Sequence, residues 1–147
     1  MTEKYFKYFP ILLLIFFDYL SVITSIYLSA ISIQIAFIPL LDLFLYYSII
    51  VFVFVFITNY LLKNYSYLNR SFGLENIKKL LLSSSIIFLL LYIFKIFLEL
   101  FNINLYFYDN YFFSFRNIIN QVILFCFFSI LFRLIVNIFS NKVFNKP

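Results

Sequence analysis

Long runs of apolar residues dominate this chain and define its expected elements. A helix rises about 1.5 Å per residue, so about 20 apolar residues cross roughly 30 Å of hydrocarbon. Runs of that length lie near residues 11–33, 43–62, 80–101 and 117–137. None of them alternates apolar and polar positions, as the strands of a membrane barrel would. Only helices and closed barrels satisfy the backbone in lipid, so the pattern predicts an all-α integral membrane protein with four transmembrane helices.

Basic residues predict the orientation of these helices. The most polar stretch is residues 63–79, between the second and third runs, and nine of the 11 Lys and Arg residues lie in it or near the two chain ends. Short loops rich in Lys and Arg stay in the cytoplasm. We therefore expect one transmembrane domain over residues 1–147, built as two hairpins, with both termini and the loop 63–79 cytoplasmic. The loop regains helical spacing at Leu74, which predicts a helix that runs directly into the third span.

Composition agrees with a lipid environment. The chain is 65% hydrophobic and 12% charged, against about 25% charged in soluble domains. Its mean hydropathy is +1.05, so the lipid bilayer is the expected partner. It has no His and one Cys. We accordingly expect no catalytic, cofactor-binding or metal site and no nucleic-acid partner, while a homo-oligomer stays open.

Asp18 is the one charge inside the first run. A carboxylate inside a membrane is costly and marks a functional candidate by default. The alternative is a structural role near the cytoplasmic interface, with the hydroxyls of Ser21, Thr24 and Ser25 solvating the carboxylate. Of these two readings, the structural one is favoured.

Four further charges lie near the ends of the third and fourth runs. Lys95 and Glu99 share a helix face, as a pair in a transport path or as a pair at the outer interface, the second being favoured. Arg116 is expected to anchor the fourth span at the outer headgroups, and Arg133 at the inner ones. Either arginine could instead contact a lipid-linked phosphate.

Several of these positions fit a longer pattern. The segment "YSYLNRSFGLEN" matches Y-R-x-x-W-R-Y-x-S-L-x-D at Tyr65, Arg70 and Leu74; "FRN" keeps the arginine of P-R-S at Arg116, and "FRLIVN" keeps the first arginine of S-R-L-x-x-R at Arg133. An aspartate early in the first span matches Asp18. The chain thereby resembles the N-terminal four-span domain of CapD-type nucleotide-sugar dehydratases and epimerases of bacterial polysaccharide synthesis. It departs from the family pattern at Ser66, Asn69 and Asn137.

The resemblance implies a function for the chain. In that family a cytoplasmic Rossmann domain performs the chemistry, and it requires a glycine-rich phosphate loop. The one glycine here, Gly73, lies in the loop between two spans. We therefore expect no enzyme activity from these residues. The expected function is a non-catalytic anchor in the bacterial inner membrane, which places a cytoplasmic nucleotide-sugar-modifying domain at the inner leaflet near lipid-linked glycan.

Two alternatives stay open. The chain could be the related membrane domain of a polyprenyl-phosphate sugar-phosphate transferase. It could also be a small four-span flippase or transporter of the GtrA type, because "ITNYLLKNYSYL" and "VNIFSNKVF" resemble that family's signatures. The scarcity of glycine in the spans argues against the second alternative, since small residues allow close helix packing in membranes.

Overall fold

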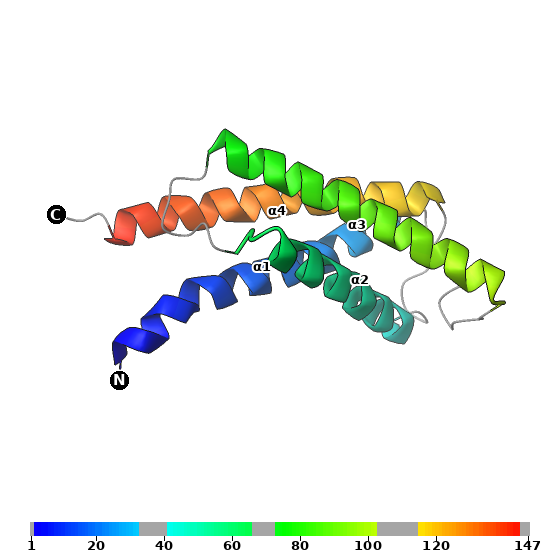
Figure 1. Cartoon of the computed structure of the whole chain (residues 1–147), viewed down its shortest axis with the longest axis horizontal. Helices are drawn as coiled ribbons and strands as arrows, with labels where there is room; N and C mark the ends of the chain where they lie inside the picture. The colour runs from blue at the N-terminus through cyan, green and yellow to red at the C-terminus, as the bar shows by residue number, and fades with distance from the viewer. Residues whose placement is uncertain (1, 33–40, 66–72, 103–114, 145–147) are drawn as a thin grey trace.

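The computed structural model describes residues 2–32, 41–65, 73–102 and 115–144, and these residues form four helices (Figure 1). They are α1 (Thr2–Ser32), α2 (Leu41–Leu61), α3 (Leu74–Leu100) and α4 (Phe115–Phe144). Within the described residues, the prediction of an all-helical fold with four helices is confirmed.

Helix boundaries differ from the predicted spans mainly at polar ends. α3 begins at Leu74, as the spacing in the loop predicted. By contrast, α1 begins at Thr2 and α4 continues to Phe144, beyond the apolar runs. Polar residues such as Glu and Lys are good helix formers, so a helix does not end where its apolar run ends.

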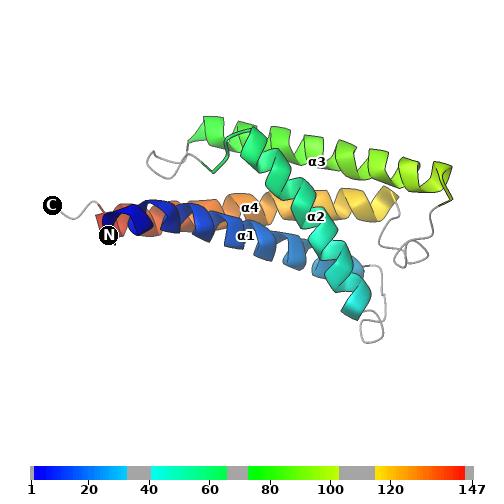
Figure 2. The ribbon, with the colours of Figure 1, turned by 60° about the horizontal axis from the view of Figure 1, so that its bottom comes forward.

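The helices form a closed ring in which each packs against its sequence neighbours and α1 packs against α4. α1 and α4 make the most extensive contact and run side by side, while α2 crosses obliquely between α1 and α3 (Figure 2). Successive helices run in opposite directions. We call the end where α1 and α3 begin and α4 finishes the termini end, and the other the far end (Figure 1).

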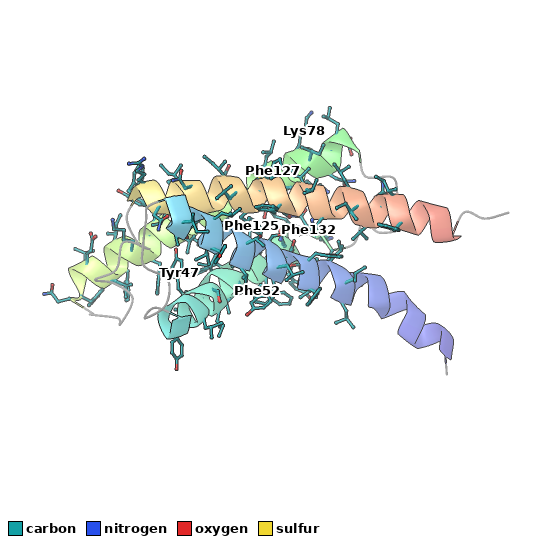
Figure 3. All side chains as sticks on the ribbon, turned by 180° about the vertical axis from the view of Figure 1, so that it is seen from behind. Tyr47, Phe52, Lys78, Phe125, Phe127 and Phe132 are labelled. Atoms are coloured by element: carbon teal, nitrogen blue, oxygen red, sulfur yellow. The ribbon has the colours of Figure 1, made fainter. Side chains whose placement is uncertain are left out.

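Apolar side chains cover the outside of the bundle as well as its core. Val22, Ile26, Val55 and Ile87 are at most 1% exposed in the centre. On α4, Phe125 points into the core, whereas Phe127 is 60% exposed (Figure 3). Water would solvate such an exterior poorly, and lipid would solvate it well.

Three helices contain stretches that are long and apolar enough to cross a membrane: Ile11–Ile31, Leu74–Leu100 and Phe115–Phe139. The corresponding stretch of α2, Leu45–Leu61, is shorter. The architecture is thus that of an α-helical protein suited to a membrane.

Candidate functional site

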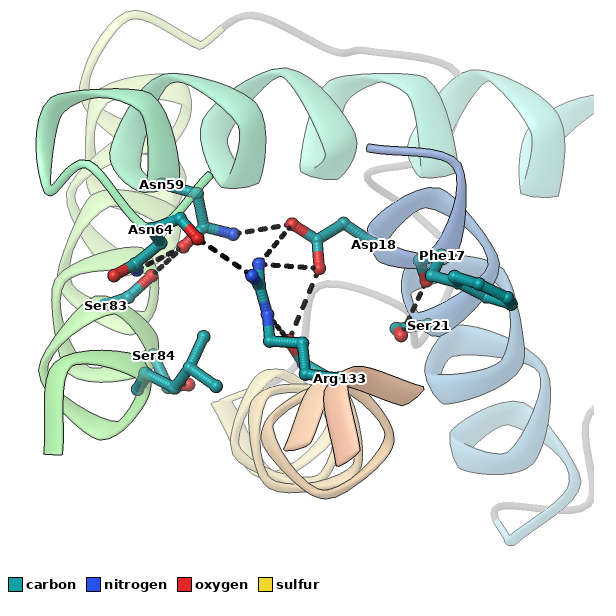
Figure 4. Close-up of polar contacts among 10 residues, drawn as sticks. Phe17, Asp18, Ser21, Asn59, Asn64, Ser83, Ser84 and Arg133 are labelled. Atoms are coloured by element: carbon teal, nitrogen blue, oxygen red, sulfur yellow. Dashed lines mark hydrogen bonds and ion pairs between the residues drawn. The ribbon is translucent and has the colours of Figure 1, made fainter. Parts of the chain in front are cut away.

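A buried ion pair joins α1 to α4 (Figure 4). Nη2 of Arg133 lies 3.0 Å from Oδ2 and 3.2 Å from Oδ1 of Asp18. Asp18 is 1% exposed and Arg133 6% exposed. Along its helix Asp18 lies about 10 Å from Ile11, where the apolar stretch of α1 begins. Each side chain therefore neutralises a charge whose burial alone would be strongly unfavourable.

Two neutral side chains complete the environment of the Asp18 carboxylate. Asn59 Nδ2 donates to Oδ2 at 2.9 Å, and Ser129 Oγ donates to Oδ1 at 3.3 Å. With the two contacts from Arg133, the carboxylate accepts four hydrogen bonds. A carboxylate offers about four lone-pair positions, so its accepting capacity is full.

The Arg133 guanidinium uses all three of its nitrogens. Besides the Asp18 contacts through Nη2, Nη1 donates to the backbone oxygen of Asn64 at 3.0 Å. Nε donates to Ser129 Oγ at 3.5 Å. The Tyr65 ring lies 5.7 Å from the guanidinium carbon, within the range of a cation–π contact. Arg133 is thus held by α1, by its own helix and by the segment after α2.

Asn59 connects the ion pair to α2 and α3. Its Oδ1 accepts from Ser83 Oγ at 2.6 Å and from Asn64 Nδ2 at 2.9 Å. Its Nδ2 donates to Asp18. All four helices therefore contribute a side chain to one buried hydrogen-bonded group, which we call the polar network: Asp18, Asn59, Asn64, Ser83, Ser129 and Arg133.

The C-terminus of α2 positions the Asn64 contribution. Lys63 adopts a left-handed conformation with φ 56°. The Asn64 N–H donates to Asn59 O at 2.9 Å, and the Lys63 N–H donates to Tyr60 O at 3.1 Å. This is the Schellman pattern of helix termination, which turns the chain back over the last turn. The turn brings Asn64 against Asn59, where their side chains add the hydrogen bond described above.

Tyr65 closes the polar network toward the termini end. It is 7% exposed and packs in a cluster with Leu14 and Val136. Its hydroxyl has no hydrogen-bond partner among the described residues. Burial, together with the neighbouring Asp18 carboxylate, raises the pKa of the Tyr65 phenol, so the phenol stays neutral at physiological pH.

A second buried polar group lies toward the far end of the bundle. Tyr47 Oη donates to Gln121 Oε1 at 2.6 Å, and the Ser29 hydroxyl donates to Asn117 Oδ1. These contacts join α4 to α2 and to α1. Apolar core residues such as Val22 and Ile26 separate this group from the polar network. Two separated polar layers fix the register of the helices better than apolar packing alone, because a shift by one turn would leave buried groups unpaired.

Three of the residues selected from the sequence meet in this site: Asp18, Tyr65 and Arg133. Arg116 is exposed at the start of α4, near the far end, and Arg70 lies outside the described residues. Lys95 and Glu99 do form the expected pair, at 3.8 Å, with side chains 21% and 46% exposed. That pair is on α3, away from the polar network.

Two expectations about the site are wrong. We expected Arg133 to reach toward the inner headgroups, but its side chain turns inward to Asp18. We expected neighbouring hydroxyls of α1 to solvate Asp18. Instead Ser21, Thr24 and Ser25 donate to backbone oxygens of their own helix. In both cases the folded bundle supplies a partner that is distant in sequence. The charge-assisted bonds between Asp18 and Arg133 are stronger than bonds from the Asp18 carboxylate to neutral hydroxyls of its own helix.

Sequence reasoning missed the neutral members of the site. Asn59, Asn64, Ser83 and Ser129 are polar residues in or beside apolar runs, as are Asn117 and Gln121 of the second layer. An amide in an otherwise apolar run requires a hydrogen-bond partner, so each of these amides indicates a buried polar contact from the sequence alone. Which partner it finds depends on how the helices pack.

The arrangement suits structural pairing more than acid–base chemistry. The Asp18 carboxylate is filled with donors, and Arg133 has a partner at every nitrogen. Among the described residues, no group of three or more His, Cys, Asp and Glu side chains is close enough to hold a metal ion. The single cysteine, Cys126, is buried.

No protein-family model, no curated protein and no solved structure matches this chain.

Proposed function

We propose that this chain is a non-catalytic membrane anchor of bacterial polysaccharide biosynthesis, which holds a nucleotide-sugar-modifying domain at the inner leaflet. One observation carries the proposal. Asp18, Tyr65 and Arg133, three positions that match the CapD-type pattern, come from three distant segments and meet in one buried site. There they bond or pack against each other, as expected for residues that maintain a bundle.

Three further features support an anchor. The exterior is apolar, three helices are long enough to cross a bilayer, and the starts of α1 and α3 share one end with the finish of α4 (Figure 1). In the proposed orientation the termini end faces the cytoplasm of a bacterial inner membrane, where most basic residues would then lie. A soluble domain held at that end would meet lipid-linked glycan at the membrane surface.

Cell fractionation tests this function. Membranes and cytosol are prepared from the source bacterium with and without the gene, and nucleotide-sugar dehydratase and epimerase activities are assayed in each. The activity is expected to sediment with membranes only when the gene is present. Complementation with the intact chain or with Lys95→Gln should restore sedimentation, and complementation with Arg133→Leu should not. An unchanged distribution of activity contradicts the proposal.

The same membranes distinguish the alternatives. Transfer of sugar phosphate to polyprenyl phosphate that depends on the gene would favour a transferase domain. Flux of a lipid-linked sugar in proteoliposomes that is lost in Asp18→Asn and Glu99→Gln would favour a flippase.

A further inference from the structure

Beside the polar network lies a buried hydrogen-bond donor, the Tyr65 hydroxyl, that has no acceptor among the described residues. All four accepting positions of Asp18 are occupied, by Asn59, Ser129 and Arg133. Both lone pairs of Asn59 Oδ1 are occupied as well. The Tyr65 hydroxyl is buried and has no hydrogen-bond partner among the described residues. Its ring lies against the Arg133 guanidinium, and Asp18 and Asn59 are near enough to act on its pKa.

A buried hydroxyl without a partner is unfavourable, and phenylalanine would avoid the penalty at the same position. The hydroxyl becomes useful only when an accepting position on Asp18 falls vacant. Arg133 has a long flexible side chain that can extend along the helix toward the membrane surface. If it left without a substitute, the carboxylate would stay buried with two neutral donors, Asn59 and Ser129.

We propose that Tyr65 is a reserve donor for Asp18, which takes over an accepting position whenever Arg133 or Ser129 withdraws. The network then has two arrangements. In the one seen here, Arg133 bonds Asp18 and the Tyr65 hydroxyl is idle. In the other, Tyr65 donates to Asp18 and Arg133 is free to turn toward the termini end. This inference goes beyond the proposed anchoring function and does not depend on it.

A set of double substitutions tests the proposal. Tyr65→Phe is made in the natural chain, in Ser129→Ala and in Arg133→Leu, and thermal unfolding is followed in detergent by circular dichroism. In the natural chain the substitution is expected to leave the midpoint unchanged or to raise it, because the hydroxyl is idle. In both other backgrounds it is expected to lower the midpoint by about 2 to 4 °C, because the hydroxyl is then bonded.

Tyr47→Phe is the matched control. Tyr47 is also a buried tyrosine, but its hydroxyl donates to Gln121, remote from Asp18. Tyr47→Phe should lower the thermal midpoint by the same amount in all three backgrounds, since the effects of distant substitutions are additive. Ser129→Ala removes a neutral donor only, so it decides the question if Arg133→Leu does not fold. The proposal would be overturned if Tyr65→Phe shifted the midpoint equally in every background that folds. It would also be overturned if Tyr65→Phe lowered the midpoint of the natural chain.

Discussion

The Asp18 carboxylate on α1 and the Arg133 guanidinium on α4 lie 3.0 Å apart, although the two residues are 115 positions apart in sequence. The pair therefore fastens the first helix to the last. Asn59 and Ser83 extend the same hydrogen-bonded group to α2 and α3. The pair thus belongs to a hydrogen-bonded group that has members on all four helices.

Removing one partner of the pair should strongly destabilise the bundle. Arg133→Leu leaves the Asp18 carboxylate buried without a cation, and we expect a loss of about 3–5 kcal/mol in the free energy of unfolding. The measurement is unfolding by sodium dodecyl sulfate from mild detergent. The double substitution Asp18→Asn with Arg133→Met should recover most of the loss, because it removes both charges and keeps an acceptor for Asn59 and Ser129. A double variant as unstable as the single one would show that the ion pair itself is not the cause.

The Lys95–Glu99 pair should matter much less. The two charged groups are 3.8 Å apart and their side chains are 21% and 46% exposed, so the medium around the bundle screens the attraction. We expect Lys95→Gln to change the free energy of unfolding by about 0–1 kcal/mol in detergent. A loss comparable to that of Arg133→Leu would mean that Lys95 has a partner beyond Glu99.

Lys63 offers a stabilising substitution. Its φ of 56° is left-handed, a conformation that costs a residue with a Cβ atom about 1–2 kcal/mol. Glycine is the usual residue at this position of the Schellman pattern. Lys63→Gly should therefore raise the free energy of unfolding by about 0.5–1 kcal/mol, after the added flexibility of the unfolded chain is included. Leu62→Gly, one residue earlier and outside the left-handed region, should lower stability.

Labelling from one side of the membrane tests the orientation. In a Cys126→Ser background, Lys78→Cys at the start of α3 and Arg116→Cys at the start of α4 place exposed thiols at opposite ends of the bundle. A membrane-impermeant maleimide applied to intact cells should label Arg116→Cys but not Lys78→Cys. Labelling of Lys78→Cys from outside would reverse the proposed topology.

Alkaline pH should destabilise the chain partly through Tyr65. Burial raises the pKa of its phenol in the folded state above the ordinary value of 10.0. Below that value the phenol is protonated in both states and adds no pH dependence. Above it the unfolded state loses the proton first, so stability falls as pH rises, by at most about 1.4 kcal/mol per pH unit. Between about pH 9 and pH 11 the natural chain should lose more stability than Tyr65→Phe. Parallel curves would contradict this.

The helices could be predicted from the sequence because each one corresponds to a continuous apolar run, which is visible without knowing how the helices pack. The four runs, and the resumption of helix at Leu74, needed no knowledge of packing. Asp18 is also recognisable as unusual from the sequence, since a charge inside an apolar run is costly. The apolar residues alone do not give the rotation of each helix about its axis, because they cover the exterior as well as the core. On α1, polar residues within the run, such as Ser21, Ser25 and Ser29, mark the buried side instead.

The pairing within the site depended on those rotations. Arg133 was assigned to the headgroups because it lies near the end of its run, and a long side chain there can reach either way. Only the packing of α1 against α4 brings Asp18 within its reach. The position of Tyr65 likewise depends on the left-handed turn at Lys63. Glycine usually marks such a turn in a sequence, and here the residue is a lysine, so the turn was not predicted.

The order of synthesis gives the Asp18–Arg133 pair a further consequence. A ribosome makes the carboxylate early and its cation 115 residues later. During that interval the emerging polypeptide carries an acid whose charge has only the amide of Asn59 and, later, the hydroxyl of Ser129 for company. The half-made protein consequently lacks the cation that pairs with its buried carboxylate, and a chain interrupted before α4 would leave Asp18 without this charged partner.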